Sequence, residues 1–223
     1  MNIYGKRINF LGDSITEGSG VSDVINNRYD NRLKAKYNLI TNNYGIGGTR
    51  LAHQTKPSEK PRYDLCISGR AYNVDPGADI TVVYGGVNDY LHGNAPFGEW
   101  GDATPATFVG AVRFIMNLFK TEFPTQTVVF MTPARCHFYG VDCTVPSPHA
   151  YKCPDARPLA DYVSVIVRTG EELGVPVLNL YENLGIDPMR EEDRVQFTAD
   201  GLHLNDDGHA RLAELLGDFL VAL

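Results

Sequence analysis

Short apolar runs alternate along this chain with longer segments of helical periodicity. Runs rich in branched aliphatic and aromatic residues predict five β-strands, at residues 8–11, 39–42, 79–84, 127–131 and 175–179. Most of these runs are nearly continuously apolar, which is typical of parallel strands that are buried on both faces. The pattern therefore indicates a parallel sheet in the middle of the fold.

The connecting segments carry the signals of helices. The polar segment 23–37 is compatible with a helix. The pair Thr104-Pro105 predicts a helix start, because a capping hydroxyl is followed by proline in the first turn. Apolar stripes with a spacing near 3.6 residues then predict three helices, over residues 108–119, from 159 to at least 166, and over 212–223.

Strands that alternate with helices predict an α/β fold, a three-layer αβα sandwich in one domain over residues 1–223. In such folds the ligand crevice lies beyond the carboxyl ends of the strands. The longest segment without a predicted element runs from Pro133 to Pro158 and is rich in proline and aromatic residues. A loop of this length in a compact domain usually serves function, so we expect it to form a lid or a wall.

Composition and charge exclude several classes of partner. The 223 residues are 43% hydrophobic, and the formal net charge of −7 disfavours nucleic acid or an anionic membrane surface as a partner. No apolar run reaches the length of a membrane span. The first residues lead into the first predicted strand without the apolar core of a signal peptide, so we expect a cytoplasmic protein unless a leader has been removed.

Cysteine is too sparse for a disulfide scaffold. Three of the four cysteines, Cys136, Cys143 and Cys153, share the long loop with His137 and His149. Zinc, a local disulfide and reduced thiols are the alternatives there. The absence of a Cys-x-x-Cys pair makes zinc the least favoured and reduced thiols the most favoured.

Four polar or glycine-rich clusters follow the predicted strands. They are Gly12-Asp13-Ser14, the stretch 43–49, Gly85 to Asp89, and Asp200-Gly201-Leu202-His203. A serine hydroxyl becomes a nucleophile when a base removes its proton, and His203 is a base that an acid three residues earlier can orient. Backbone N–H groups and the Asn88 amide are donors that could stabilise an oxyanion.

These clusters resemble the blocks of the SGNH hydrolases, also called GDSL esterases/lipases, in their order and over nearly the whole chain. The first block reads Gly12-Asp13-Ser14-Ile15-Thr16-Glu17, the second Ile46-Gly47-Gly48, the third Gly86-Val87-Asn88-Asp89 and the last Asp200-Gly201-Leu202-His203. The resemblance implies a flavodoxin-like sheet of order 2-1-3-4-5 and a serine hydrolase without a metal or other cofactor. It is specific because all four blocks occur together.

The resemblance also implies roles for individual residues. Ser14 would be the nucleophile, His203 the base and Asp200 its acid partner. The oxyanion hole would comprise the backbone N–H of Ser14, Gly48 and the side chain of Asn88. We expect Asp13 and Asp89, next to these positions, to give hydrogen-bonding support.

Less specific interpretations exist for each block. Ser14 alone could be a helix cap, and Asn88 a turn residue. The glycines at 45–48 lack the Gly-x-Gly-x-x-Gly spacing of a dinucleotide site. A non-catalytic ligand-binding module on the same fold is an alternative of another class. We expect the histidines outside the blocks to lie at the surface or behind the site, and His209 to face solvent or cap a neighbour.

The loops suggest the substrate. Their aromatic side chains with hydrogen-bonding tips suit a sugar or a short acyl pocket, and they contain no long apolar stretch. We expect hydrolysis of short acyl esters, above all acetyl esters, on small molecules or glycans. Lysophospholipase or acyl-thioesterase activity on longer chains is the alternative. The residues expected to bind substrate are Arg50, Tyr90, Trp100, Arg135, His137 and Tyr139.

Overall fold

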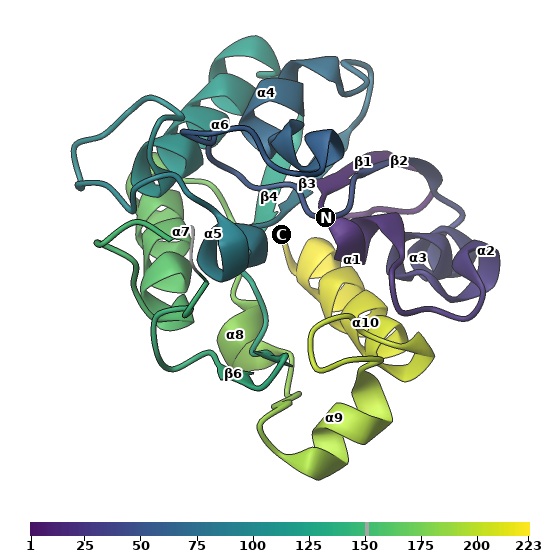
Figure 1. Cartoon of the computed structure of the whole chain (residues 1–223). Coiled ribbons are helices and arrows are strands. Elements are labelled where there is room, and N and C mark those ends of the chain that lie inside the picture. Colours follow the sequence, from purple (N-terminus) through teal and green to yellow (C-terminus); the bar gives the residue numbers. More distant parts are fainter. Residues whose placement is uncertain (150–151) are drawn as a thin grey trace.

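A parallel five-stranded sheet forms the middle layer of the computed structural model, which describes residues 1–149 and 152–223 (Figure 1). The sheet has the spatial order β2-β1-β3-β4-β7. Taken in chain order, this is the 2-1-3-4-5 arrangement of flavodoxin-like folds, so the predicted fold is confirmed. The strands are β1 (Arg7–Gly12), β2 (Ile40–Gly45), β3 (Ile80–Tyr84), β4 (Thr127–Met131) and β7 (Val177–Leu178).

Helices cover both faces of this sheet (Figure 1). One face packs against α4 (Ile67–Arg70), α5 (Val87–His92), α6 (Phe108–Glu122) and α7 (Leu159–Leu173), and the other against α3 (Tyr29–Tyr37) and α10 (Asp206–Ala222). Among the described residues, no helix combines the length and apolar character needed to cross a membrane. The shorter helices are α1 (Ser14–Glu17), α2 (Val24–Asn27), α8 (Leu180–Asn183) and α9 (Glu191–Phe197), with 3₁₀ turns at Pro61–Asp64 and Ala71–Asn73.

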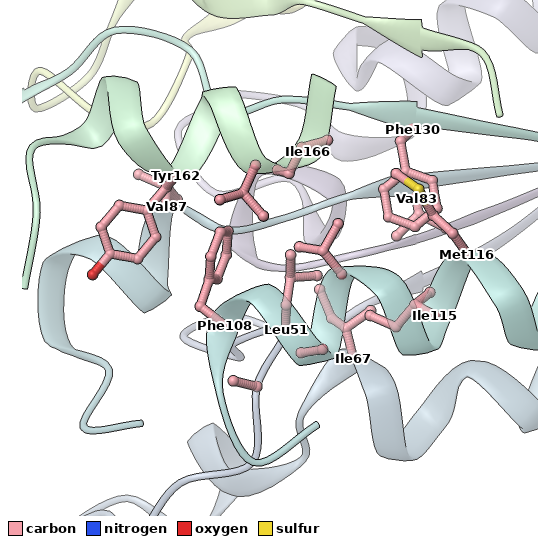
Figure 2. Packing of buried hydrophobic residues seen from close by; sticks show 14 of the residues in the cluster. Leu51, Ile67, Val83, Val87, Phe108, Ile115, Met116, Phe130, Tyr162 and Ile166 are labelled. Carbon is pink, nitrogen blue, oxygen red and sulfur yellow. The ribbon is translucent and has the colours of Figure 1, made fainter. Parts of the chain in front are cut away.

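Successive side chains of the central strands enter two separate cores. Leu11, Val83 and Phe130 belong to the core under α6 and α7, whereas their neighbours in sequence pack under α3 and α10. This follows from the two-residue period of a strand that is buried on both faces. Figure 2 shows the first core, where Ile115 and Met116 of α6 approach Val83 and Phe130 of the sheet.

Several boundaries differ from those predicted. Helix α6 begins at Phe108, because Thr107 rather than Thr104 caps it by accepting a hydrogen bond from the Gly110 N–H at 3.1 Å. The segment 23–37 forms two helices, because Arg28 adopts an extended conformation between them. The predicted loop 133–158 contains a short hairpin of β5 (His137–Phe138) and β6 (Val141–Asp142).

The buried face of α6 supplies a test of the core. Replacing Ile115 by alanine removes a fully buried side chain, and we expect the free energy of unfolding to fall by about 2–5 kcal/mol. Val221→Ala, at an exposed position of α10, should change it by less than about 0.5 kcal/mol. Urea denaturation of both variants measures the difference. Equal losses would show that α6 does not anchor this core.

Candidate active site

Ser14 lies at the point where β1 ends and α1 begins. Asp13 caps α1, since one of its carboxylate oxygens accepts a hydrogen bond from the Ile15 N–H at 3.0 Å. The cap fixes Ser14 as the first helical residue, with its side chain largely buried. The glycines at the ends of β1 and β2 have no room for a side chain because α1 packs directly against them. A Cβ on Gly12 would lie 2.2 Å from Thr16 Oγ1, and one on Gly45 would lie 2.2 Å from Glu17 N. Strands β1 and β2 thus hold α1 by direct backbone contact.

His203 reaches Ser14 from the opposite end of the chain. Its Nε2 lies 2.9 Å from Ser14 Oγ, and its Nδ1 lies 2.6 Å from Asp200 Oδ2. The other oxygen of Asp200 accepts the N–H groups of Leu202 and His203 at 3.0 and 2.8 Å, which closes the turn. The structure therefore brings the three predicted residues into one continuous hydrogen-bond sequence.

The electrostatics of Asp200 favour its charged form. Partial burial acts to raise the pKa of this carboxyl, but hydrogen bonds from the His203 side chain and backbone outweigh that effect. The pKa of Asp200 consequently lies below its usual value. A carboxylate that stays ionised next to Nδ1 holds the proton of the imidazole on that nitrogen and leaves Nε2 free to face Ser14.

The glycine loop after β2 lies next to Ser14. A Cβ on Gly47 would lie 3.4 Å from the Ser14 Cβ. Gly48 has a φ of +77°, and a Cβ there would lie only 2.1 Å from Tyr63 Cε1, so both backbone conformation and space require glycine. Gly48 and Ser14 line the same pocket, as the predicted oxyanion hole requires.

Asn88, in α5 after β3, is the third group at this edge of the sheet. Its Nδ2 donates to Thr49 O at 3.1 Å and to Asp13 Oδ2 at 3.3 Å. Its Oδ1 lies 2.9 Å from His92 Nε2. The amide nitrogen of this buried side chain therefore faces the strand ends, and the oxygen faces away from them.

The orientation of Asn88 follows from a buried relay. Arg50 Nη2 lies 2.9 Å from His92 Nδ1, and because arginine can only donate, Nδ1 must accept. The proton of neutral His92 then sits on Nε2 and is donated to Asn88 Oδ1. Burial, reinforced by the positive charge of Arg50, lowers the pKa of His92 to about 3, so the imidazole is neutral near pH 7.

The two supporting aspartates perform different tasks. Asp13 caps α1 and receives Asn88, whereas Asp89 accepts the N–H groups of Leu51 and Ala52 at 2.7 and 3.0 Å and so secures the chain after the glycine loop. Desolvation by burial raises the pKa of each carboxyl to about 6, against the opposing effect of these backbone hydrogen bonds. Both act on the framework around Ser14 and leave Asp200 as the acid that contacts His203.

These groups open onto a pocket of about 1270 Å³. Ser14, Gly48, Asn88 and His203 line it on the sheet side. The β5–β6 hairpin supplies another part of the wall through Phe138, whose ring meets that of His203 edge-on at a centroid distance of 5.9 Å. The hairpin is fixed there because the His137 N–H donates to Gly201 O at 2.9 Å. The expectation that the long loop forms a wall of the site fits this placement.

Of the six residues expected to bind substrate, Tyr139 and Arg50 line the pocket, and Arg50 is also bound to other side chains. Tyr139 is exposed at the tip of the hairpin. Arg50 also reaches the pocket, but it is buried and bound to Ser58, to the Tyr63 carbonyl and to His92. Its main structural role is to orient His92.

The other four expected substrate residues lie elsewhere, which corrects the prediction. Tyr90 is fully buried, and its hydroxyl is close to the carbonyl oxygens of Asp142 and Val145. Trp100 is stacked between arginine side chains of α6 and α7. Arg135 stacks on Tyr181 and donates to its carbonyl oxygen, and the His137 ring faces Arg194.

Sequence reasoning missed two residues that shape the site. Glu17 accepts the Gly47 N–H at 2.9 Å and Arg62 at 2.6 Å, so it ties the glycine loop to α1. Arg70 donates to the carbonyl oxygens of Gly12 and Tyr44 at 3.0 and 2.7 Å and thereby joins the ends of β1 and β2. Glu17 stands inside the first block and could have been suspected, whereas no local signal marks Arg70.

Two further predictions on polar residues can be compared with the structure. His209 is fully buried and does not face solvent, but it does cap a neighbour, the second of the two expectations. Its Nδ1 accepts the Tyr29 N–H at the start of α3 at 3.2 Å, and its ring stacks on Tyr29. All four cysteines are free thiols, and Cys136 and Cys143 are buried neighbours that hydrogen-bond to each other. Within the described residues, no three His, Cys, Asp or Glu side chains are grouped to hold a metal ion.

Comparisons with known proteins identify the family. Residues 10–211 match the model of the GDSL-like Lipase/Acylhydrolase family, so the chain belongs to that family and is a carboxylic ester hydrolase, as the four blocks predicted. No curated protein matches the chain.

Solved structures share the fold. A protein from Lactobacillus plantarum is 29% identical, with 98% of each chain covered and a TM-score of 0.81. A two-domain esterase active on acetylated mannans is 20% identical and has a TM-score of 0.63, covering 97% of this chain and 48% of the esterase. The same kind of esterase with mannopentaose gives a TM-score of 0.59 at 20% identity, with 97% and 49% covered.

The relay behind Asn88 can be tested directly. We expect ¹⁵N spectra of histidine-labelled protein to show His92 as the neutral tautomer with its proton on Nε2, and to show no titration of this ring above about pH 4, because its pKa is about 3. A His92→Gln variant assigns the signal. A ring that becomes cationic between pH 5 and 7 would contradict the relay.

Proposed function

We propose that the protein hydrolyses short-chain acyl esters, above all acetyl esters, through Ser14, His203 and Asp200. The observation that carries this proposal is the unbroken hydrogen-bond sequence Ser14 Oγ to His203 Nε2 and His203 Nδ1 to Asp200 within the large pocket. A nucleophile, a base within reach of it and a group that orients the base are the three parts that acyl transfer requires.

The geometry suggests the following course. His203 Nε2 takes the proton of Ser14 while Oγ attacks the ester carbonyl carbon, and Asp200 stabilises the imidazolium that forms. The C–O bond to the alcohol then breaks, and the alcohol leaves with the proton from Nε2. Water, activated by the same histidine, hydrolyses the acyl-enzyme in the second half of the cycle and restores Ser14.

The oxyanion would be held by the backbone N–H groups of Ser14 and Gly48 and by Asn88 Nδ2. Asn88 is well placed for this because the relay through His92 fixes its amide orientation before substrate arrives. The contact of Nδ2 with Asp13 is the longer of its two hydrogen bonds, at 3.3 Å. We infer that the oxyanion replaces this contact, while the bond to Thr49 O keeps the amide in place.

The pocket lining favours a short acyl group on a polar alcohol. Charged and hydrogen-bonding side chains surround the entrance, including Arg62, Lys60 and Asn94. A long alkyl chain would have to cover these groups and deprive them of water, at a cost that polar partners would not offset. The solved esterase that acts on acetylated mannans shares this fold, which supports, by analogy, an acetylated carbohydrate as substrate.

Removing the nucleophile tests the mechanism. Ser14→Ala should lower kcat for 4-nitrophenyl acetate by at least about 10³-fold, because Ser14 carries the one hydroxyl within the described residues that hydrogen-bonds to His203. Ser19→Ala is the matched control in the same pocket, and should stay within about threefold of the parent enzyme. Undiminished hydrolysis by the Ser14 variant would refute the mechanism, and a parent enzyme without esterase activity would favour a binding module.

A series of acyl chains tests the substrate class. Hydrolysis of 4-nitrophenyl acetate, butyrate, octanoate and palmitate should give a kcat/KM that falls with chain length, by about tenfold or more beyond butyrate, since a longer chain would cover charged and hydrogen-bonding side chains that share the lining with apolar ones. A panel of acetylated sugars then extends the test to the alcohol. A maximum at octanoate or palmitate would favour lysophospholipase or acyl-thioesterase activity instead.

A further inference from the structure

The charge of the pocket is opposite to the charge of the protein. The whole chain has 27 acidic and 20 basic residues, apart from histidine. The pocket, in contrast, is lined by five arginine and lysine residues against two glutamates. A concave site with one sign of charge concentrates ligands of the opposite sign. The basic residues that line it are Arg50, Lys56, Lys60, Arg62 and Lys152.

Two of these cations are already matched by acids. Arg62 binds Glu17 at 2.6 Å, and Arg50 lies 3.6 Å from Asp64. Both are therefore parts of the framework described above. The charge that a ligand could use resides on the three lysines.

Lys152 is the most unusual of these lysines because it is largely buried in the pocket wall. Among the described residues, its ammonium group donates to the Asp89 carbonyl and, at 3.2 Å, to the Tyr162 hydroxyl, both of which are neutral oxygens. Within residues 1–149 and 152–223, it takes part in no salt bridge. The carboxyl groups of Asp89 and Asp155 attract this cation without pairing with it directly, so an anionic ligand in the pocket could offset the cost of its partial desolvation.

Lys56 and Lys60 lie on a second segment of the chain that lines the pocket. Both are exposed, and Lys60 is held over the Tyr63 ring at 5.4 Å from its centroid. Tyr63 in turn packs against Gly48, beside the proposed oxyanion hole. Positive groups from two segments of the chain therefore line the pocket that contains Ser14.

We propose that the natural substrate is an anionic ester, whose non-reacting part carries a negative charge that Lys152, Lys56 and Lys60 recognise. This inference rests on the proposed esterase function and specifies its substrate class. A carboxylate, sulfate or phosphate on the alcohol part shares the required chemistry. A sugar acid bearing an acetyl group combines this charge with the short acyl group of the proposed function.

The test compares esters that differ in charge alone. 4-Acetoxybenzoate and 4-acetoxybenzenesulfonate carry a negative charge at pH 7, and 4-acetoxybenzamide is their neutral counterpart. After each rate is divided by the rate of alkaline hydrolysis, we expect kcat/KM for at least one anion to exceed that for the amide by about tenfold. The preference should shrink at 0.5 M salt, because salt screens charges.

Charge-neutralising variants locate the effect. Lys152→Gln and the double variant Lys56→Gln/Lys60→Gln should each lower the anion-to-amide ratio by about threefold or more. Lys34→Gln, on α3 outside the pocket, removes the same charge and should leave the ratio unchanged. The double variant alters exposed side chains only, so it serves even if Lys152→Gln fails to fold.

The outcomes separate this inference from the proposed function. Hydrolysis of all three esters with no preference for either anion, or a ratio that the lysine variants do not change, would overturn the anionic substrate and leave the esterase intact. If the parent enzyme hydrolyses none of the three esters, the proposed esterase function itself is overturned. A preference that falls in the pocket variants and persists in Lys34→Gln supports the inference.

Discussion

The site depends on the level ends of three parallel strands. In the registers of β1 with β2 and β3, Gly12 stands opposite both Gly45 and Tyr84. Because these strands end at one height, the residues that follow them meet at the point where the strand order reverses. Ser14 follows β1 and Asn88 follows β3, so their spacing is set by the backbone hydrogen bonds of the sheet rather than by flexible side chains. A register shift in any of the three strands would separate them.

Burial adds a second constraint at this edge. Asp13, Asp89, Asn88 and His92 are polar groups held out of water, where each unmatched hydrogen bond would cost free energy. In the structure these side chains hydrogen-bond to one another and to backbone groups, so that the orientation of one side chain determines the orientation of the next. Arg50 fixes the tautomer of His92, which fixes the amide of Asn88. A network of this kind has one satisfied arrangement, which is how it can hold an oxyanion donor in place in advance.

The sequence predicted the sheet through its periodicity, whereas the strand order and the grouping of Ser14, Asp200 and His203 were implied by the resemblance of its four blocks to a known family. It did not predict what buried side chains do across the fold. Arg50 and Tyr90 are residue types that often bind substrates, but here they have structural tasks. Arg50 orients His92, and the hydroxyl of Tyr90 on α5 lies against the carbonyl oxygens of Asp142 and Val145. His209 was expected to face solvent or to cap a neighbour, and only the structure shows that it is buried, stacks on Tyr29 and caps α3 there. Such roles depend on contacts between segments distant in sequence, for which a single chain offers no local signal.

The division between strand ends and loops explains why reaction class is easier to infer than substrate. The proposed reaction at Ser14 needs a few groups at fixed distances from its hydroxyl. Short sequence motifs at the edge of the sheet provide these groups. In the proposed function, selection of the alcohol would fall to the hairpin and to the basic segment around Lys56 and Lys60, where side chains come from loops that tolerate change. In a protein with an acidic surface, cations collected around one pocket are not explained by solubility, since they reduce the net charge. Their placement beside the nucleophile is therefore best understood as part of substrate recognition.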